Sequence, residues 1–210
     1  MKQFLLLFFL SFLLVGLSCN KANPTGGDNQ ANKESGDQQN KEIALLKEKA
    51  EKGDVNAQLE LGGKYVSGEE GVEEDYKEAA KWFSLAAQQN NPKAQYALGF
   101  LYYTGEGVTQ DYAEAFRLTK LSAEQGIGDA QYLLANMYRN GRGVAVDLVR
   151  AYMWASLSIA NLLPETASDP ENIQDIENLK AALLASMTAE QKQQAEQQAI
   201  TCKNNNYKNC

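Results

Sequence analysis

Apolar side chains recur along the middle of the chain with the spacing of one face of an α-helix. Three times an alanine is followed by a leucine four residues later and a tyrosine eight residues later. The sets are Ala57, Leu61 and Tyr65; Ala94, Leu98 and Tyr102; and Ala130, Leu134 and Tyr138. Each set predicts a helix with one buried face. The alanines lie 37 (94−57) and 36 (130−94) residues apart, and a period of this length predicts stacked helical hairpins.

Glycine and aspartate positions between these sets mark the ends of the predicted helices. A glycine follows each tyrosine by three residues, at Gly68, Gly105 and Gly141. Glycine suits the left-handed backbone that commonly ends a helix. An aspartate then stands where the second helix of each hairpin would begin, at Asp75, Asp111 and Asp147. Aspartate is a favoured N-cap residue, so we expect three hairpin repeats over residues 54–90, 91–126 and 127–161.

The segments on either side of the repeats predict caps. Residues 41–53 align with the end of a second helix and predict one N-terminal capping helix. Residues 162–210 lose the period and predict capping helices at the C-terminal end, because terminal repeats must cover an exposed core. The predicted fold class is therefore all-α, a right-handed α/α superhelix of antiparallel hairpins capped at both ends. Trp82 and Trp154 fall at matched positions of the second helices and are expected in the core.

The first residues of the chain predict export and a lipid anchor. Residues 4–17 are almost entirely apolar and follow Lys2, which indicates a signal peptide over residues 1–18. Ser18 directly before Cys19 resembles a bacterial lipobox, so Cys19 is the expected lipidation site. Ordinary signal cleavage that leaves a free thiol is the alternative. Residues 20–40 contain no large apolar side chain, so residues 19–40 are expected to be the lipidated cysteine and a flexible tether. No aspartate follows Cys19, which favours the outer membrane in a Gram-negative host.

The remaining cysteines form a candidate pair. The chain has three cysteines, and a lipid on Cys19 leaves Cys202 and Cys210. Three consecutive asparagines before residue 207 are expected to end the helix, so that the tail folds back and the two sulfurs meet in a disulfide. Two free thiols in a reducing compartment are the alternative, which the signal segment disfavours.

Composition narrows the possible chemistry. The chain has no histidine, which removes histidine-dependent catalytic triads and histidine-ligated zinc. The formal net charge is −7 without a basic stripe, which argues against nucleic acid and leaves the lipid as the only predicted membrane attachment. The acidic turn at residues 69–75 is expected to be solvated rather than a cation site. We therefore expect no cofactor and no metal.

The repeated pattern Ala-Gln-x3-Gly-x2-Tyr-x2-Gly, followed by Gly-Val-x2-Asp and the tryptophan of the second helix, resembles the Sel-one-like repeat family, which is related to tetratricopeptide repeats. Ala135 in place of glycine and Leu118 in place of tryptophan are the departures. The resemblance implies an α/α superhelix that serves as a noncatalytic protein-interaction scaffold, with a protein or peptide partner that it does not name. Two alternatives stay open: an envelope enzyme or binder acting on peptidoglycan-like or β-lactam ligands, and a secreted factor acting on host proteins.

The first helices of such superhelices usually line the concave side, and their variable positions are candidate binding residues. In the second and third repeats these positions are Tyr96, Phe100, Tyr103, Tyr132, Asn136 and Arg139. Tyrosine and arginine are enriched at interaction hot spots, so these six residues are the predicted partner-binding surface. The alternative is that some of the rings, especially Tyr96 and Tyr132, pack between neighbouring repeats.

Overall fold

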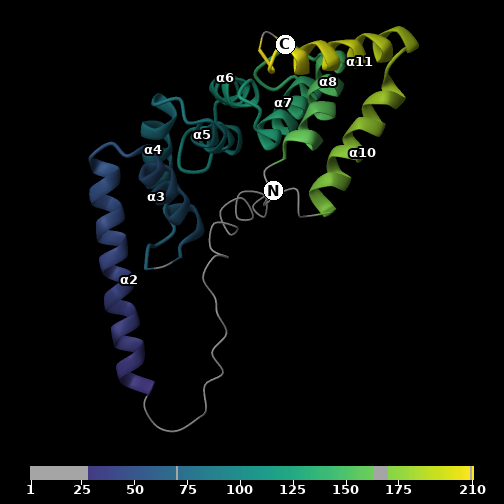
Figure 1. Ribbon diagram of the computed structural model, residues 1–210. Coiled ribbons are helices and arrows are strands. Elements are labelled where there is room, and N and C mark those ends of the chain that lie inside the picture. Colours follow the sequence, from purple (N-terminus) through teal and green to yellow (C-terminus); the bar gives the residue numbers. More distant parts are fainter. Residues whose placement is uncertain (1–27, 70, 163–169, 209) are drawn as a thin grey trace.

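The computed structural model describes residues 28–69, 71–162, 170–208 and 210. Within these residues the regular structure is helical, and consecutive helices pack against one another in a curved array (Figure 1). The predicted all-α superhelix is confirmed. The helices are α2 (Asp28–Glu51), α3 (Val55–Ser67), α4 (Tyr76–Gln88), α5 (Pro92–Thr104), α6 (Tyr112–Ala123), α7 (Gly128–Asn140), α8 (Leu148–Ser158), the 3-10 helix η2 (Ile159–Asn161), α10 (Pro170–Ser186) and α11 (Ala189–Asn204).

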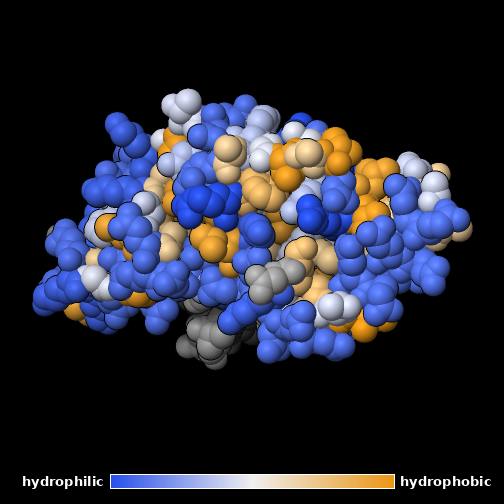
Figure 2. All heavy atoms as spheres, turned by 90° about the horizontal axis from the view of Figure 1, so that it is seen from above, coloured by the Kyte–Doolittle hydropathy of each residue, from blue (hydrophilic) through white to orange (hydrophobic). Residues whose placement is uncertain are grey.

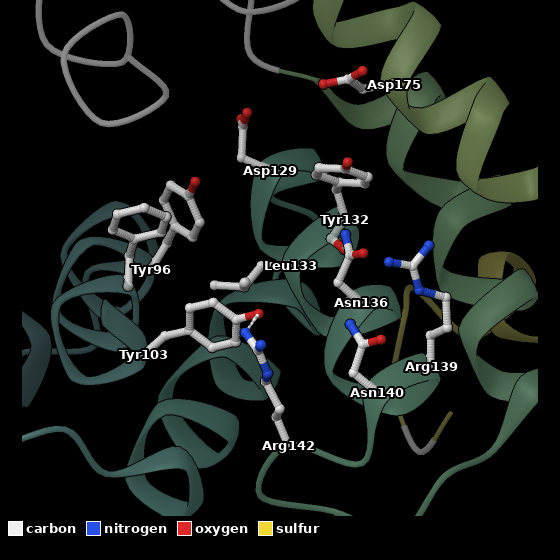
Figure 3. A pocket seen from close by; sticks show the side chains of 11 residues that line it. Tyr96, Tyr103, Asp129, Tyr132, Leu133, Asn136, Arg139, Asn140, Arg142 and Asp175 are labelled. Carbon is white, nitrogen blue, oxygen red and sulfur yellow. Dashed lines mark hydrogen bonds between the residues drawn. The ribbon is translucent and has the colours of Figure 1, made fainter. Parts of the chain in front are cut away.

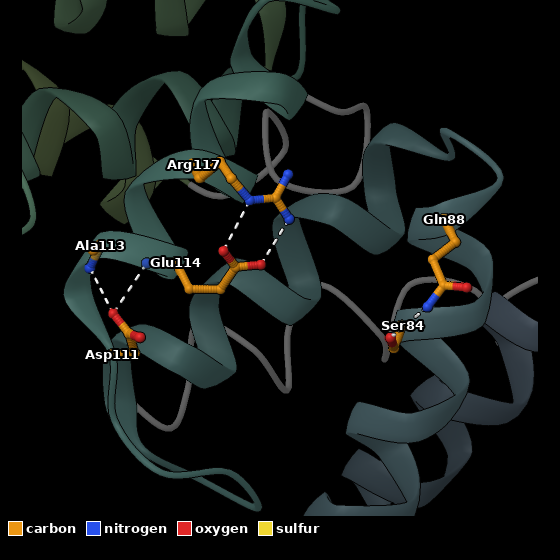
Figure 4. A network of polar contacts seen from close by, with 6 residues as sticks. All are labelled: Ser84, Gln88, Asp111, Ala113, Glu114 and Arg117. Atoms are coloured by element: carbon orange, nitrogen blue, oxygen red, sulfur yellow. Dashed lines mark hydrogen bonds and ion pairs between the residues drawn. The ribbon is translucent and has the colours of Figure 1, made fainter.

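Side-chain caps begin most of the helices of the three hairpins α3–α4, α5–α6 and α7–α8. In Figure 4 a carboxylate oxygen of Asp111 accepts hydrogen bonds from the backbone N–H groups of Ala113 at 2.9 Å and Glu114 at 3.1 Å. The Glu114 carboxylate turns to Arg117, with an N–O distance of 2.6 Å, instead of completing a capping box. Ile127 precedes α7 without a side-chain cap.

The glycines of the Gly-Val turns let successive hairpins approach closely. Gly107 has φ +71°, and a Cβ atom placed on it would lie 2.2 Å from the carbonyl oxygen of Tyr76 in the preceding hairpin. At Gly143, with φ +73°, the equivalent Cβ would lie 1.9 Å from the carbonyl oxygen of Tyr112. Both turns therefore require glycine for the backbone conformation and for the contact with the previous repeat.

Buried glutamines make hydrogen bonds within a hairpin or to the element before it. Gln58 donates to the Ala50 carbonyl at 3.0 Å, and Gln131 donates to the Ala123 carbonyl at 3.1 Å. Gln95 accepts from Gln125 at 2.7 Å. These glutamines are the second residue of each Ala-Gln pair, for which sequence reasoning had assigned no role. They are 3%, 0% and 2% exposed, respectively, so their amides stay satisfied inside the stack.

The N-terminal helix is longer than the sequence predicted. Helix α2 begins at Asp28, so the boundary at residue 41 is wrong, and residues 28–40 are helical rather than part of a flexible tether. Glutamine, lysine and glutamate are good helix formers, and extending an existing helix is easier than nucleating one. The predicted signal peptide, Cys19 and the tether up to residue 27 lie outside the described residues. In the described part of the chain, no helix has the length and apolar character needed to cross a membrane.

The C-terminal helices cover the last hairpin. Both α10 and α11 pack on α8, and Leu157 of α8 is only 5% exposed, whereas the equivalent Leu85 and Leu121 of earlier repeats are 38% and 37% exposed. The face shown in Figure 2 is mostly polar, with apolar side chains gathered in smaller patches. Beyond α11, Cys202 and Cys210 form a disulfide with Cα atoms 5.4 Å apart.

Candidate peptide-binding groove

A cavity of about 440 Å³ opens between α5, α7 and α10, and we call it the groove. All six residues predicted to bind a partner line it. The lining side chains are Tyr96, Phe100, Tyr103, Asp129, Tyr132, Leu133, Asn136, Arg139, Asn140, Arg142 and Asp175. Figure 3 shows these side chains arranged around a shared space.

Two helices position the predicted residues in register. Tyr96, Phe100 and Tyr103 follow one another along α5 at the spacing of a single helix face. Tyr132, Asn136 and Arg139 occupy the same positions one repeat later, on α7. Because the two helices belong to adjacent repeats, the two rows face one groove.

The rings on α5 are both core and lining residues. Tyr96, Phe100 and Tyr103 are 4%, 6% and 7% exposed and belong to the main hydrophobic core. Tyr96 is therefore both a core residue and part of the groove wall. Tyr132 is half-buried and Arg139 is exposed. The α5 side of the groove is consequently rigid, and the α7 side presents more accessible side chains.

Arg142 holds the ring of Tyr103 in place. Its guanidinium donates a hydrogen bond to the Tyr103 hydroxyl and lies 5.0 Å from the centre of that ring. It also lies 5.4 Å from the ring centre of Tyr112, which contacts Tyr103 edge-on with centroids 5.5 Å apart. A cation over two rings favours this arrangement, so one end of the groove is preorganised.

Two tyrosine hydroxyls of the groove have raised pKa values. Burial raises the pKa of Tyr96 well above its usual range, and the nearby Asp129 carboxylate adds to the shift. Burial also raises the pKa of Tyr132, with Asp175 contributing in the same direction and Arg139 in the opposite one. Both phenols are therefore neutral near pH 7 and can donate or accept hydrogen bonds.

Two carboxylates and two guanidinium groups are among the side chains that line the groove. Figure 3 shows Asp129 and Asp175 on one side of Tyr132, Arg139 beside Asn136, and Arg142 beside Tyr103. Asp129 is 6% exposed and Asp175 is half-buried. The arrangement can pack aromatic rings against an apolar segment and present the guanidinium groups of Arg139 and Arg142 to an anionic group. Among the described residues, no group of acidic or cysteine side chains could hold a metal ion.

Sequence reasoning missed several lining residues. Arg142 replaces the glutamates found at or near this turn position in the earlier repeats, Glu106 and Glu69. That reversal of charge could have identified Arg142 as a candidate binding residue from the sequence. Asp175 had none, because it comes from α10, outside the repeats, and reaches the groove only through the packing of the cap.

Comparison with known proteins settles the family. The Sel1 repeat is matched three times, over residues 55–91, 92–127 and 128–161. These ranges follow the three hairpins and together span about half of the chain. This chain belongs to the Sel1 repeat family. Sel1 repeats typically mediate protein–protein interactions and form noncatalytic scaffolds.

Solved structures support the same assignment. A Sel1 repeat protein from Oxalobacter formigenes is similar at 34% sequence identity with a TM-score of 0.53, over 65% of this chain and 98% of that protein. A protective antigen present in uropathogenic Escherichia coli strains, displaying an SLR fold, is similar at 27% identity with a TM-score of 0.52. That similarity covers 76% of this chain and 40% of the antigen. No curated protein matches the chain.

Proposed function

We propose that this Sel1 repeat protein is a noncatalytic scaffold that binds a protein partner by accepting one of its peptide segments in the groove. The observation that carries the proposal is the convergence of six variable repeat positions on one cavity. Positions that vary between repeats can serve a role beyond the formation of the repeat itself. The six side chains line one cavity, and tyrosine and arginine are enriched at the hot spots of protein interfaces.

The volume and lining of the groove also support a peptide ligand. About 440 Å³ lies within the usual range of ligand sites, roughly 300–1,000 Å³. The walls combine four aromatic rings with a few polar groups, which is the composition expected where apolar contact provides affinity and polar groups fix orientation.

Affinity recovery of the full chain from its native host tests this proposal. Partners captured by the wild type are compared with those captured by Arg139→Ala and Asn136→Ala variants, whose side chains are exposed and half-buried, respectively. Arg117→Ala is the matched control, because Arg117 is an exposed arginine on α6. We expect the groove variants to lose a protein that the control retains. Equal capture by all of these proteins would refute binding in the groove.

We further propose that the scaffold is exported and attached to the bacterial cell envelope by a lipid on Cys19. The apolar segment 4–17 and the Ser18-Cys19 pair support this. A Cys19→Ser variant should fail to incorporate labelled palmitate and should leave the membrane fraction, whereas the wild type should be labelled and sediment with membranes. An unlabelled wild-type protein recovered from the culture medium would refute the anchor and favour a secreted factor.

A further inference from the structure

We propose that Arg142 binds a carboxylate side chain, an Asp or Glu within a peptide segment of the partner, in the part of the groove next to Tyr103. Arg142 would be the specificity-determining residue of the groove, and Tyr103 would position its guanidinium. This inference rests on the proposed function and adds the chemistry of the partner.

The two arginines of the groove differ from the other two arginines of the chain. Arg117 and Arg150 each form an ion pair with an acidic residue three positions earlier, at N–O distances of 2.6 and 3.6 Å. Within the described residues, neither Arg139 nor Arg142 forms an ion pair with a carboxylate. Arg139 is exposed, whereas Arg142 is half-buried. A partly desolvated charge gains most from an ionic partner, so Arg142 is the stronger candidate for an anionic group of the ligand.

The contacts that Arg142 does make orient its guanidinium without neutralising it. The guanidinium donates a hydrogen bond to the Tyr103 hydroxyl and lies 5.0 and 5.4 Å from the ring centres of Tyr103 and Tyr112. The next residue, Gly143, packs against the backbone of Tyr112, which fixes the turn to the preceding hairpin. A guanidinium that is already ordered loses little conformational entropy when a ligand binds, and its positive charge remains available.

The hydrogen-bond donors at this turn favour a carboxylate on a side chain over one at a chain end. Chain ends are commonly captured by clusters of backbone N–H groups. The backbone N–H groups of Gly141 and Arg142 both donate to the carbonyl oxygen of Met137, so they point into α7. The Arg142 side chain is therefore the donor. It has five N–H groups, one of which binds Tyr103, and the others can hold a carboxylate through two parallel hydrogen bonds.

The surrounding wall favours apolar residues next to the acidic one. Leu133 and Phe100 line the same cavity and are 8% and 6% exposed. Figure 3 shows Leu133 among the side chains that share this space with Tyr103 and Arg142. A peptide that places its carboxylate on Arg142 would therefore bring its neighbouring side chains against an apolar surface, where burial adds affinity.

A library of random dodecapeptides displayed on phage supplies the probes. Peptides that bind the full chain are counter-selected on an Asn136→Trp variant, checked for folding by circular dichroism, because a tryptophan at this half-buried lining position would fill part of the cavity. We expect the remaining, groove-dependent peptides to share an internal Asp or Glu next to an apolar residue. Groove-dependent peptides without a shared acidic position would overturn the inference and leave binding in the groove intact.

A double-mutant cycle then isolates the ion pair. One selected peptide and its amide analogue, Glu→Gln or Asp→Asn, are made with blocked ends and a dye, and binding is followed by fluorescence polarisation. The amide analogue should bind the wild type about tenfold more weakly, as loss of a charged hydrogen bond produces. Arg142→Gln should bind both peptides equally. Arg117→Gln, at an exposed and ion-paired arginine on α6, should keep the tenfold preference.

Tyr103→Phe tests the positioning role, because it keeps the ring and removes the hydroxyl that binds Arg142. We expect it to reduce the preference for the acidic peptide, whereas a merely structural role would change the affinity for both peptides by the same factor. A tenfold preference that persists in Arg142→Gln would overturn the inference.

Two further outcomes would also overturn it. An amide analogue that regains the lost affinity when its C-terminal carboxylate is left free would assign the site to a chain end instead. Absence of any groove-dependent peptide would leave Arg142 without the proposed ligand. The proposed function then fails as well only if partner capture is insensitive to Arg139→Ala and Asn136→Ala.

Discussion

Replacing Gly143 by alanine tests whether the Gly-Val turns fix the stacking of the repeats. The new Cβ atom would lie 1.9 Å from the carbonyl oxygen of Tyr112. An ordinary carbon–oxygen contact is about 3.3 Å, so one of the two backbones must move by about 1.4 Å. Because Tyr112 belongs to the neighbouring hairpin, the strain acts on the interface between repeats.

The magnitude follows from two separate costs. A residue with a Cβ atom in the left-handed region costs about 1–2 kcal/mol, and Gly143 has φ +73°. Overpacking against a neighbour that can only partly relax adds about 1–3 kcal/mol. The free energy of unfolding should therefore fall by about 2–5 kcal/mol.

Gly53→Ala is the matched control. Gly53 also has a positive φ, +93°, but a Cβ atom there would meet nothing within 4 Å. Gly53→Ala should therefore lose stability only through the strain of the left-handed backbone. The entropy that the unfolded chain loses on a Gly→Ala change is the same in both variants. Urea unfolding of both variants, followed by circular dichroism, gives the difference. A Gly143→Ala protein no less stable than Gly53→Ala would refute the role assigned to the turn.

Three further predictions concern the core, the tail and pH. Trp154 is 1% exposed, so Trp154→Ala should lower the free energy of unfolding by about 3–5 kcal/mol in urea titrations. Replacing both Cys202 and Cys210 by alanine should cost about 2–3 kcal/mol, and reductant should destabilise the wild type equally while leaving the variant unchanged. The raised pKa of Tyr96 means that the unfolded chain loses this proton first, so the contribution is intact below about pH 10 and is lost at higher pH. Tyr96→Phe should therefore reduce the fall in stability between pH 9.5 and 11, a range chosen around that value, and an unchanged slope would contradict the assignment.

The repeated hairpins were predictable because single residues at the helix ends determine where each helix begins and ends. Asp75 and Asp111 cap the helices that follow them, and Gly105 takes the left-handed backbone, φ +80°, predicted at the end of α5. Each of these features depends on a few neighbouring residues. The six groove positions were found for the same reason, since a fixed period transfers the orientation of one helix to the next.

The features that sequence reasoning missed depend on contacts between distant segments. Asp175 joins the groove only because α10 packs on α8, the helix that follows α7. Asn161 donates a hydrogen bond to Gln131 at 3.0 Å and accepts one from the Tyr207 hydroxyl at 2.9 Å. The tail beyond α11 is thereby linked to the buried glutamine of the third repeat. The start of α2 at Asp28 was missed because a polar helix has no apolar face for periodicity to detect.

A photocrosslinking amino acid at position 136 in living host cells tests the central claim most directly. Asn136 is half-buried in the groove, and Gln88, on α4, is an exposed control position outside it. We predict that the probe at position 136 forms a crosslink to one partner protein, and that the crosslink is lost when Arg139→Glu is added. A probe at position 88 should form no such crosslink. Equal crosslinking of the same partner from both positions, unaffected by Arg139→Glu, would contradict a groove-based scaffold.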